Sequence, residues 1–188
     1  MNIVLIGYRG AGKSTVGSRL AIRMGKVFAD TDDLLEKSQG SSIRDIVDSC
    51  GWGHFRALEK RIIEEVSQKD NLIIAPGGGA VLDPENVMSL RKNGLIIWLK
   101  AGREVLGQRI AQDSRTVASR PTLTGKGALE EFEEVMASRN PFYERAADAE
   151  LDTSALDIEE AVEAVLSIIR RKMGGVHWAG IRSERFSG

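Results

Sequence analysis

Residues 7–15 read GYRGAGKST and follow a short apolar run at residues 3–6. The stretch has the Walker A spacing: a glycine, four further residues and then Gly12-Lys13-Ser14. Glycines let backbone N–H groups approach phosphate oxygens, and the helix that follows adds its positive N-terminal end. An ordinary glycine turn rarely combines this spacing with a strand before it and a helix after it. The stretch therefore predicts nucleotide binding.

Two side chains of this loop have distinct expected roles. Lys13 can reach the β- and γ-phosphates, and the Ser14 hydroxyl can bind Mg²⁺. The motif alone does not separate an ATPase, a GTPase switch and a small-molecule kinase. A GTPase is expected to carry an NKxD-type segment that reads guanine, and this chain has none. The residues expected to contact the nucleotide are Gly10, Ala11, Gly12, Lys13, Ser14 and Thr15.

Short apolar segments alternate with amphipathic ones along the chain, which predicts an α/β fold with a parallel sheet covered on both faces. The expected strands are residues 3–6, 27–29, 72–75, 95–99 and 150–153. The expected helices are residues 13–24, 32–37, 42–49, 53–69, 84–93, 103–111, 128–147 and 158–172, with Pro141 as a candidate break. Residues 112–127 are polar and without a clear period, which is typical of a functional or mobile loop.

The composition limits the class of partner and compartment. The chain has 188 residues, enough for one domain, with 26 basic and 27 acidic residues and a net charge of −1. This balance gives no reason to expect a nucleic acid or an anionic membrane as a partner. No apolar run approaches the ~20 residues of a membrane helix, and the N-terminus does not resemble a signal peptide. The single cysteine, Cys50, fits a reducing compartment and is expected to be at least half-buried. We expect a cytoplasmic monomer.

FADTDD, residues 28–33, follows the second expected strand. Asp30 and Asp32 then fall at the carboxyl end of a parallel strand, where such sheets bind ligands. One carboxylate could hold Mg²⁺ through water, and the other could orient a hydroxyl or accept its proton during phosphoryl transfer. The alternative is that these aspartates cap a helix.

Two further stretches carry groups that suit a polar acceptor. HFRALE, residues 54–59, places Arg56 on a helix, and an arginine fork binds a planar carboxylate well. PGGGAV, residues 76–81, places three glycines after a buried strand, where the backbone can approach a ligand closely. The alternatives are a solvated surface arginine and a flexible turn.

The last two stretches supply more arginines. SRPTL, residues 119–123, puts Arg120 in the irregular segment, where it could act as a lid cation beside the phosphates. SRNPFYERA, residues 138–146, supplies Arg139 and Arg145. In isolation, all three would be read as solvated charges.

Together and in this order, the six stretches resemble the shikimate kinase family, over roughly residues 1–170. The resemblance implies a P-loop NTPase with a nucleoside-monophosphate-kinase-like three-layer fold, a five-stranded parallel sheet and a lid. It implies transfer of the ATP γ-phosphate to the 3-hydroxyl of shikimate, on the route to chorismate and the aromatic amino acids. The implied division is a kinase domain over residues 1–172, with a substrate-binding region at about 32–62 and a lid at about 112–126. The tail, residues 173–188, has no assigned role.

The resemblance also implies roles for particular residues. Asp32, Lys13 and Arg120 would be catalytic, with Asp32 holding the ring hydroxyls and activating the attacking one. Arg56 and Arg139 would bind the carboxylate of shikimate, and Gly77, Gly78 and Gly79 would contact the substrate through their backbone. Ser14 and Asp30 would lie at the metal, while Arg120 would reach ATP and Arg109, with the loop at 153–156, would lie near adenine.

The residue before the glycine triplet departs from the family pattern. Many members of the family carry Thr or Ser directly before the glycine triplet, whereas this chain has Pro76. Metal ordering would then rest more on Asp30 and Ser14.

Two other functions share parts of this pattern. A gluconate-type kinase shares the phosphate loop and fold, and a nucleotide-dependent switch shares the loop. The set of Arg56, Gly77–Gly79 and Arg139 argues against both.

Overall fold

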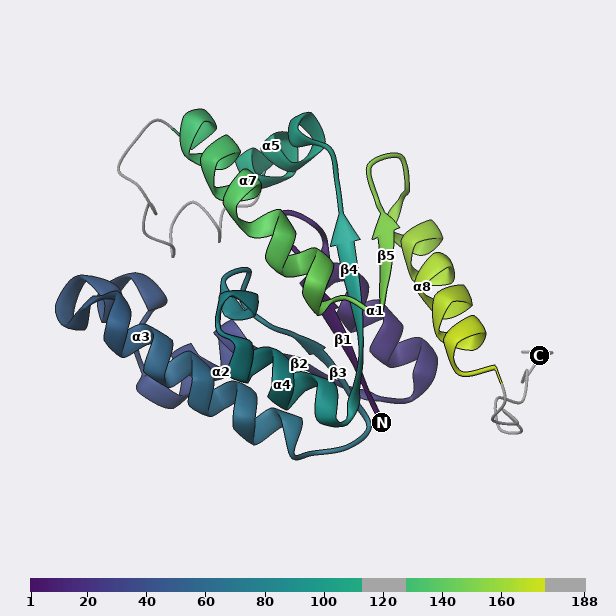
Figure 1. The fold of residues 1–188 in the computed structure, drawn as a ribbon, viewed down its shortest axis with the longest axis horizontal. Helices are drawn as coiled ribbons and strands as arrows, with labels where there is room; N and C mark the ends of the chain where they lie inside the picture. Colours follow the sequence, from purple (N-terminus) through teal and green to yellow (C-terminus); the bar gives the residue numbers. More distant parts are fainter. Residues whose placement is uncertain (113–127, 175–188) are drawn as a thin grey trace, which may run out of the picture.

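The computed structural model describes residues 1–112 and 128–174. Its centre is a single parallel sheet in which the first strand lies in the middle, in the order β2-β3-β1-β4-β5 (Figure 1). The strands are β1 (Asn2–Ile6), β2 (Val27–Asp30), β3 (Leu72–Ala75), β4 (Gly94–Lys100) and β5 (Ala149–Asp152). All of β1 is buried, because its alternate residues face helices on opposite sides of the sheet.

Helices cover both faces and make three layers, as expected. Their bounds are α1 (Lys13–Met24), α2 (Thr31–Gln39), α3 (Ile43–Ser67), η1 (Ala80–Leu82), α4 (Pro84–Lys92), α5 (Arg103–Gln112), α7 (Ala128–Ala146) and α8 (Ile158–Lys172). On one face, Ile3 and Leu5 of β1 pack with residues of α1 and α8. On the other, Val4 and Ile6 pack with residues of α3, α4 and α7. The predicted five-stranded parallel α/β fold is therefore confirmed.

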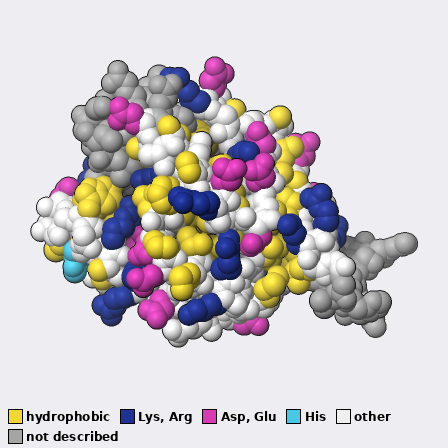
Figure 2. All heavy atoms as spheres, in the orientation of Figure 1, with side chains coloured by type: hydrophobic (Ala, Val, Ile, Leu, Met, Phe, Trp, Pro, Cys, Tyr) yellow, Lys and Arg dark blue, Asp and Glu magenta, His cyan; other side chains and the backbone are white. Residues whose placement is uncertain are grey.

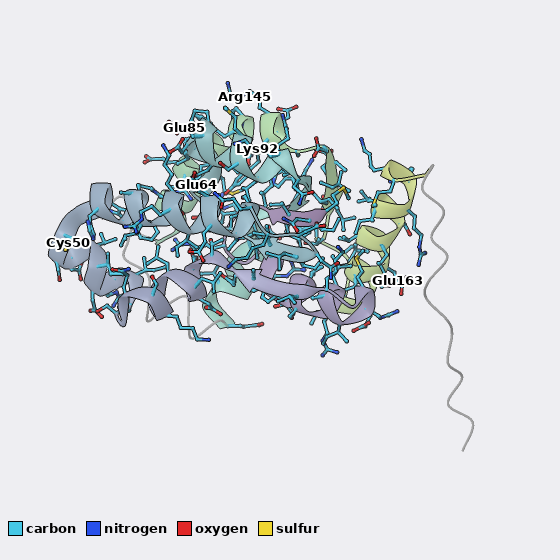
Figure 3. The ribbon with its side chains drawn as sticks, turned by 90° about the horizontal axis from the view of Figure 1, so that it is seen from below. Cys50, Glu64, Glu85, Lys92, Arg145 and Glu163 are labelled. Atoms are coloured by element: carbon cyan, nitrogen blue, oxygen red, sulfur yellow. The ribbon has the colours of Figure 1, made fainter. Side chains whose placement is uncertain are left out.

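Three local expectations differ from the structure. The helices expected at 42–49 and 53–69 join as α3, with a kink at Gly51, whose φ of 77° and ψ of 168° are not helical. Helix α7 continues through Pro141, although proline lacks the N–H of a helical hydrogen bond. Burial of Tyr143 and Ala146 against the sheet in the turn that follows compensates for that loss. Cys50 is exposed, not half-buried, because it lies beside the Gly51 kink at the outer end of α3 (Figure 3).

The expected lid and tail are for the most part not described. Residues 113–127, which include Arg120, and residues 175–188 lie outside the described residues. Among those described, no helix is both long and apolar enough to cross a membrane. Acidic and basic side chains are interspersed on the face in Figure 2, in keeping with the near-zero net charge.

Candidate active site

The loop between β1 and α1 has the backbone that its glycines predict. Gly7, Gly10 and Gly12 have φ values of 146°, 80° and 91°, which side chains other than glycine rarely adopt. The buried Lys13 side chain folds back beneath the loop, where Nζ donates to the carbonyls of Gly7 at 2.8 Å and Tyr8 at 3.1 Å. The loop thus fixes an ammonium group at the start of α1, where an anion can meet both the cation and the helix N-terminus.

Gly7 also has a steric requirement, from which a first prediction follows. A Cβ at Gly7 would lie 2.4 Å from the backbone oxygen of Leu99, at a φ that strains any L-residue. Gly7→Ala should therefore lower the free energy of unfolding by roughly 2–4 kcal/mol, measured by urea denaturation. Gly53→Ala is the matched control, since a Cβ there meets nothing within 4 Å and helical alanine is favoured. Equal stability of the two variants would contradict the argument.

Asp30 connects the phosphate loop to α2. Its Oδ2 accepts a hydrogen bond of 2.6 Å from the Ser14 hydroxyl, and its Oδ1 accepts one of 3.0 Å from the Asp32 backbone N–H. Asp30 is therefore the N-cap of α2, as the alternative interpretation of FADTDD expected, and it also accepts the Ser14 hydrogen bond.

No group of three or more His, Cys, Asp or Glu side chains in the described part of the chain could hold a metal ion by itself. One hydroxyl and one carboxylate suit Mg²⁺, which takes few protein ligands and completes its shell with water and phosphate oxygens.

A cleft of about 500 Å³ extends from the phosphate loop toward the start of α8. We call it the nucleotide cleft. Its far end includes Arg109 from α5 and Thr153 after β5. Arg109 donates to the Thr153 hydroxyl at 3.1 Å and to the Thr153 carbonyl at 2.9 Å, which fixes the guanidinium at the cleft wall. The wall is completed by Arg9, Gly10–Val16, Asp30, Asp32, Pro76, Leu156, Asp157, Ile158 and Ala161.

A second pocket lies on the α3 side of the phosphate loop, and we call it the acceptor pocket. Asp32 and Arg139, both nine-tenths buried, contribute opposite charges to it. Arg56 of α3 is the second cation in its wall. The complete lining is Tyr8, Arg9, Asp32, Ile43, Trp52, Phe55, Arg56, Glu59, Gly77, Gly78, Gly79 and Arg139.

The glycine triplet is required here for space and not for an unusual φ, since none of its φ values is positive. A Cβ at Gly77 would lie 2.7 Å from Asp32 Oδ1 and 2.9 Å from Glu59 Oε1. A Cβ at Gly79 would lie 2.4 Å from Arg56 Nη2. The triplet backbone therefore lies directly against the charged groups of α2 and α3.

Arg56 is held from three sides. Its Nη1 donates to Glu59 Oε2 at 2.6 Å, and Glu59 is only 2% exposed. Its Cζ lies 5.0 Å from the ring centre of Phe55 and 5.5 Å from that of Trp52, within the range of cation–π attraction. These contacts fix the direction of the guanidinium before any ligand arrives.

Glu59 is a site residue that the sequence reasoning missed. Burial raises the pKa of its carboxyl, and the neighbouring Asp32 raises it further, while Arg56 and Arg139 oppose the shift. Glu59 Oε1 is buried and has no hydrogen-bond partner among the described residues, so the pocket holds an unused acceptor. The signal was present in HFRALE, where a glutamate follows Arg56 by one helical turn.

Tyr143 supports the triplet from behind and was also missed. Its hydroxyl donates to the Gly78 carbonyl at 2.5 Å, and its ring stacks on Trp98 with centroids 5.6 Å apart. Burial raises the pKa of Tyr143 to about 12, with Arg139 and Arg56 opposing the shift, so the hydroxyl stays a donor at neutral pH. The tyrosine therefore orients a backbone that lines the acceptor pocket.

The structure brings most of the predicted site residues into these two adjoining spaces. The residues assigned to the acceptor, Asp32, Arg56, Arg139 and the triplet, line one pocket, and those assigned to nucleotide and metal line the cleft. Arg120 lies outside the described residues. Arg145 lines neither the acceptor pocket nor the nucleotide cleft. Its guanidinium lies 4.8 Å from the Phe142 ring centre, and Figure 3 shows it on the outer side of the molecule near Glu85.

A phosphate loop lies beside a polar pocket at one edge of the sheet in this three-layer fold. This combination defines a P-loop kinase of small molecules. Residues 9–170 match the family model described as shikimate kinase. A shikimate kinase from Syntrophus aciditrophicus is 40% identical over 173 residues, which are 88% of this chain and 89% of the relative. One from Caldanaerobacter subterraneus is 42% identical over 165 residues, 88% and 94% of the respective chains. The chain belongs to the shikimate kinase family.

A solved structure supports the same assignment. The structure of the shikimate kinase from Acinetobacter baumannii in complex with shikimate has a TM-score of 0.84 and 29% identity to this chain. The match covers 91% of this chain and 93% of that one. The shikimate kinase from Aquifex aeolicus matches with a TM-score of 0.77 at 29% identity, over 94% and 100% of the two chains.

Proposed function

We propose that this site transfers the γ-phosphoryl group of ATP to the 3-hydroxyl of shikimate, giving shikimate 3-phosphate and ADP. The observation that carries the proposal is the convergence of two arginines, a buried carboxylate and a glycine backbone in a pocket that adjoins the phosphate loop. An acceptor with one carboxylate and several hydroxyls needs these groups. Family membership supports the same substrate.

Charge complementarity sets the orientation of the acceptor. Arg56 and Arg139 bind its carboxylate, since guanidinium forks match planar oxygens with two hydrogen bonds. Asp32 accepts hydrogen bonds from the ring hydroxyls at the opposite end of the pocket, where that pocket meets the nucleotide cleft. The reacting hydroxyl is thereby directed at the terminal phosphate.

The chemical step then follows from this placement. The 3-oxygen of shikimate forms a bond to the γ-phosphorus, and the bond from that phosphorus to the β–γ bridging oxygen breaks with its electron pair on ADP. The hydroxyl proton passes to Asp32 as the new bond forms. Lys13 stabilises the charge on the β- and γ-phosphate oxygens from beneath the loop.

The nucleotide cleft suits ATP and Mg²⁺. Gly10 to Thr15 supply backbone N–H groups for the phosphates, and Arg109 lies where the base end of the nucleotide would bind. Ser14 and Asp30 would hold Mg²⁺ directly or through water, and the bound ion would neutralise charge on the phosphate oxygens. We assign Arg120 as a further cation on ATP from the family resemblance alone.

Thr31 supplies a hydroxyl beside the glycine triplet, where Pro76 has none. Its buried Oγ1 accepts a hydrogen bond of 3.2 Å from the Gly77 backbone N–H, so it fixes the start of the triplet where Pro76 offers no hydroxyl. We therefore propose that Pro76 leaves the activity intact. We propose a monomer in the cytoplasm, where a biosynthetic enzyme that uses ATP finds its co-substrate.

The raised pKa of Glu59 gives a pH prediction. Below that pKa, Glu59 is protonated and no longer holds Arg56 as an ion pair. Because the shift is upward from the usual 4.5, the KM for shikimate should begin to rise, as the pH is lowered, at a higher pH than the titration of an ordinary glutamate would give. Glu59→Gln should have a raised KM that no longer depends on pH in this range, measured from initial rates at pH 5–8. A Glu59→Gln profile parallel to wild type would contradict the assignment.

A coupled ADP-release assay tests the proposed function. The protein is incubated with ATP, Mg²⁺ and either shikimate, gluconate or no acceptor. Turnover that depends on shikimate is expected, with shikimate 3-phosphate identified by mass spectrometry. Turnover without an acceptor, or with gluconate alone, would overturn the proposal in favour of an ATPase switch or a gluconate-type kinase.

A further inference from the structure

Arg9 occupies the junction between the acceptor pocket and the nucleotide cleft. Among the described residues, Arg9 and Asp32 alone line both spaces. Asp32 has a role in the proposed function, whereas Arg9 has none. The junction therefore carries one carboxylate and one guanidinium, and phosphorus must cross it when it moves from nucleotide to acceptor.

Several contacts fix Arg9 at this place. Its backbone nitrogen lies 3.7 Å from where a Cβ on Gly78 would be, so the phosphate loop and the glycine triplet meet here. Its Cζ lies 5.6 Å from the centre of the Tyr8 ring, and its Nε is buried. The side chain is half-buried and begins within the phosphate loop.

The other described cations of the site each line one of the two spaces. Lys13 lies beneath the loop against the carbonyls of Gly7 and Tyr8, and Arg109 is bound to Thr153 at the far end of the cleft. Arg56 is paired with Glu59 inside the acceptor pocket. Arg139 lines the acceptor pocket beside Arg56, so Arg9 is the one described cation that lines both spaces.

We propose that the Arg9 guanidinium contacts the phosphoryl oxygens during transfer and is a further catalytic residue. This inference rests on the proposed function. The phosphoryl group lies midway between the two spaces only while the bond to the 3-oxygen of shikimate forms and the bond to ADP breaks, so its charged oxygens are nearest the junction at that moment. A cation fixed at the junction therefore stabilises the transition state more than either ground state, which raises kcat.

Arg9→Met removes the charge and keeps a side chain of similar length. It should lower kcat about 100-fold and change the KM values for ATP and shikimate less than about threefold. The kcat of Arg9→Lys should lie between those of wild type and Arg9→Met, because lysine keeps the positive charge but replaces the guanidinium fork with a point charge. Arg61→Met, an exposed arginine of α3 outside both spaces, is the matched control and should retain wild-type kcat.

Binding of a transition-state mimic separates this role from a structural one. Wild type, Arg9→Met and Arg61→Met are titrated calorimetrically with ADP alone, and with ADP, Mg²⁺, aluminium fluoride and shikimate together. Arg9→Met should bind ADP normally and the combined mimic about 100-fold more weakly. If Arg9→Met has a lowered melting temperature, the Arg9→Lys variant is measured in the same way.

Each outcome decides between distinct conclusions. An unchanged kcat, or a raised shikimate KM at constant kcat, would overturn the catalytic role of Arg9. Equal weakening of ADP and of the mimic would likewise overturn it in favour of ground-state phosphate binding. Failure of the wild type to phosphorylate shikimate would instead remove the proposed function, whatever the variants do.

Discussion

Asp32→Asn is expected to lower kcat for shikimate about 1,000-fold while the KM for ATP changes little. The amide keeps the size of the carboxylate but cannot take the proton of the attacking hydroxyl. Asp32 is nine-tenths buried and faces Gly77 and the junction, so bulk water does not readily replace it as the base. The loss should appear in kcat, because the proton moves only in the transition state.

The measurement is steady-state kinetics at saturating ATP and shikimate, with ATP affinity measured separately by calorimetry. Asp33→Asn is the matched control, since Asp33 is the neighbouring aspartate but is exposed. A kcat reduced less than about tenfold would show that Asp32 orients the hydroxyl without accepting its proton. A loss confined to ATP affinity would place Asp32 at the nucleotide instead.

The sheet and phosphate loop could be predicted because their signals are local. The buried run at residues 3–6 and the glycine spacing after it depend on backbone rules that hold in any such loop. The carboxylates were harder to assign. Asp30 and Asp32 are two residues apart, and only the start of α2 at Thr31 makes Asp30 the cap and leaves Asp32 facing the pocket.

The acceptor side depends on contacts between elements distant in sequence, and local patterns do not report these. A glutamate on an amphipathic helix is expected to face solvent, yet Glu59 is buried because Arg56 and the triplet surround it. The glycines of the triplet were expected to let the backbone approach a ligand, with a flexible turn as the alternative. What requires them is the space taken by side chains of α2 and α3, which appears only when β3 and these helices pack together.

Arg56→Ala is expected to raise the KM for shikimate about 100-fold and leave ATP affinity nearly unchanged. The substitution removes one of two guanidinium forks from the carboxylate end of the acceptor pocket and removes no group that lines the nucleotide cleft. Initial-rate kinetics with each substrate varied in turn measure both effects. Arg44→Ala, an arginine of α3 outside both spaces, is the control. Equal losses for ATP and shikimate would contradict the placement.

The same substitution should also destabilise the protein, and this effect can be separated from binding. Without Arg56, the buried Glu59 carboxylate loses its ion-pair partner. The expected cost is roughly 1–3 kcal/mol, below that of a fully buried pair because Arg56 is one-third exposed. The melting temperature should fall by roughly 3–9 °C, measured by calorimetry.

Arg56→Ala combined with Glu59→Gln distinguishes the two effects. The neutral amide no longer buries an uncompensated charge, so the melting temperature should recover by at least about half while the raised shikimate KM remains. Recovery of both would mean that Arg56 acts mainly by stabilising the fold around Glu59. Recovery of stability alone would show that the guanidinium contacts the acceptor directly, because the double variant regains stability while it still lacks that guanidinium.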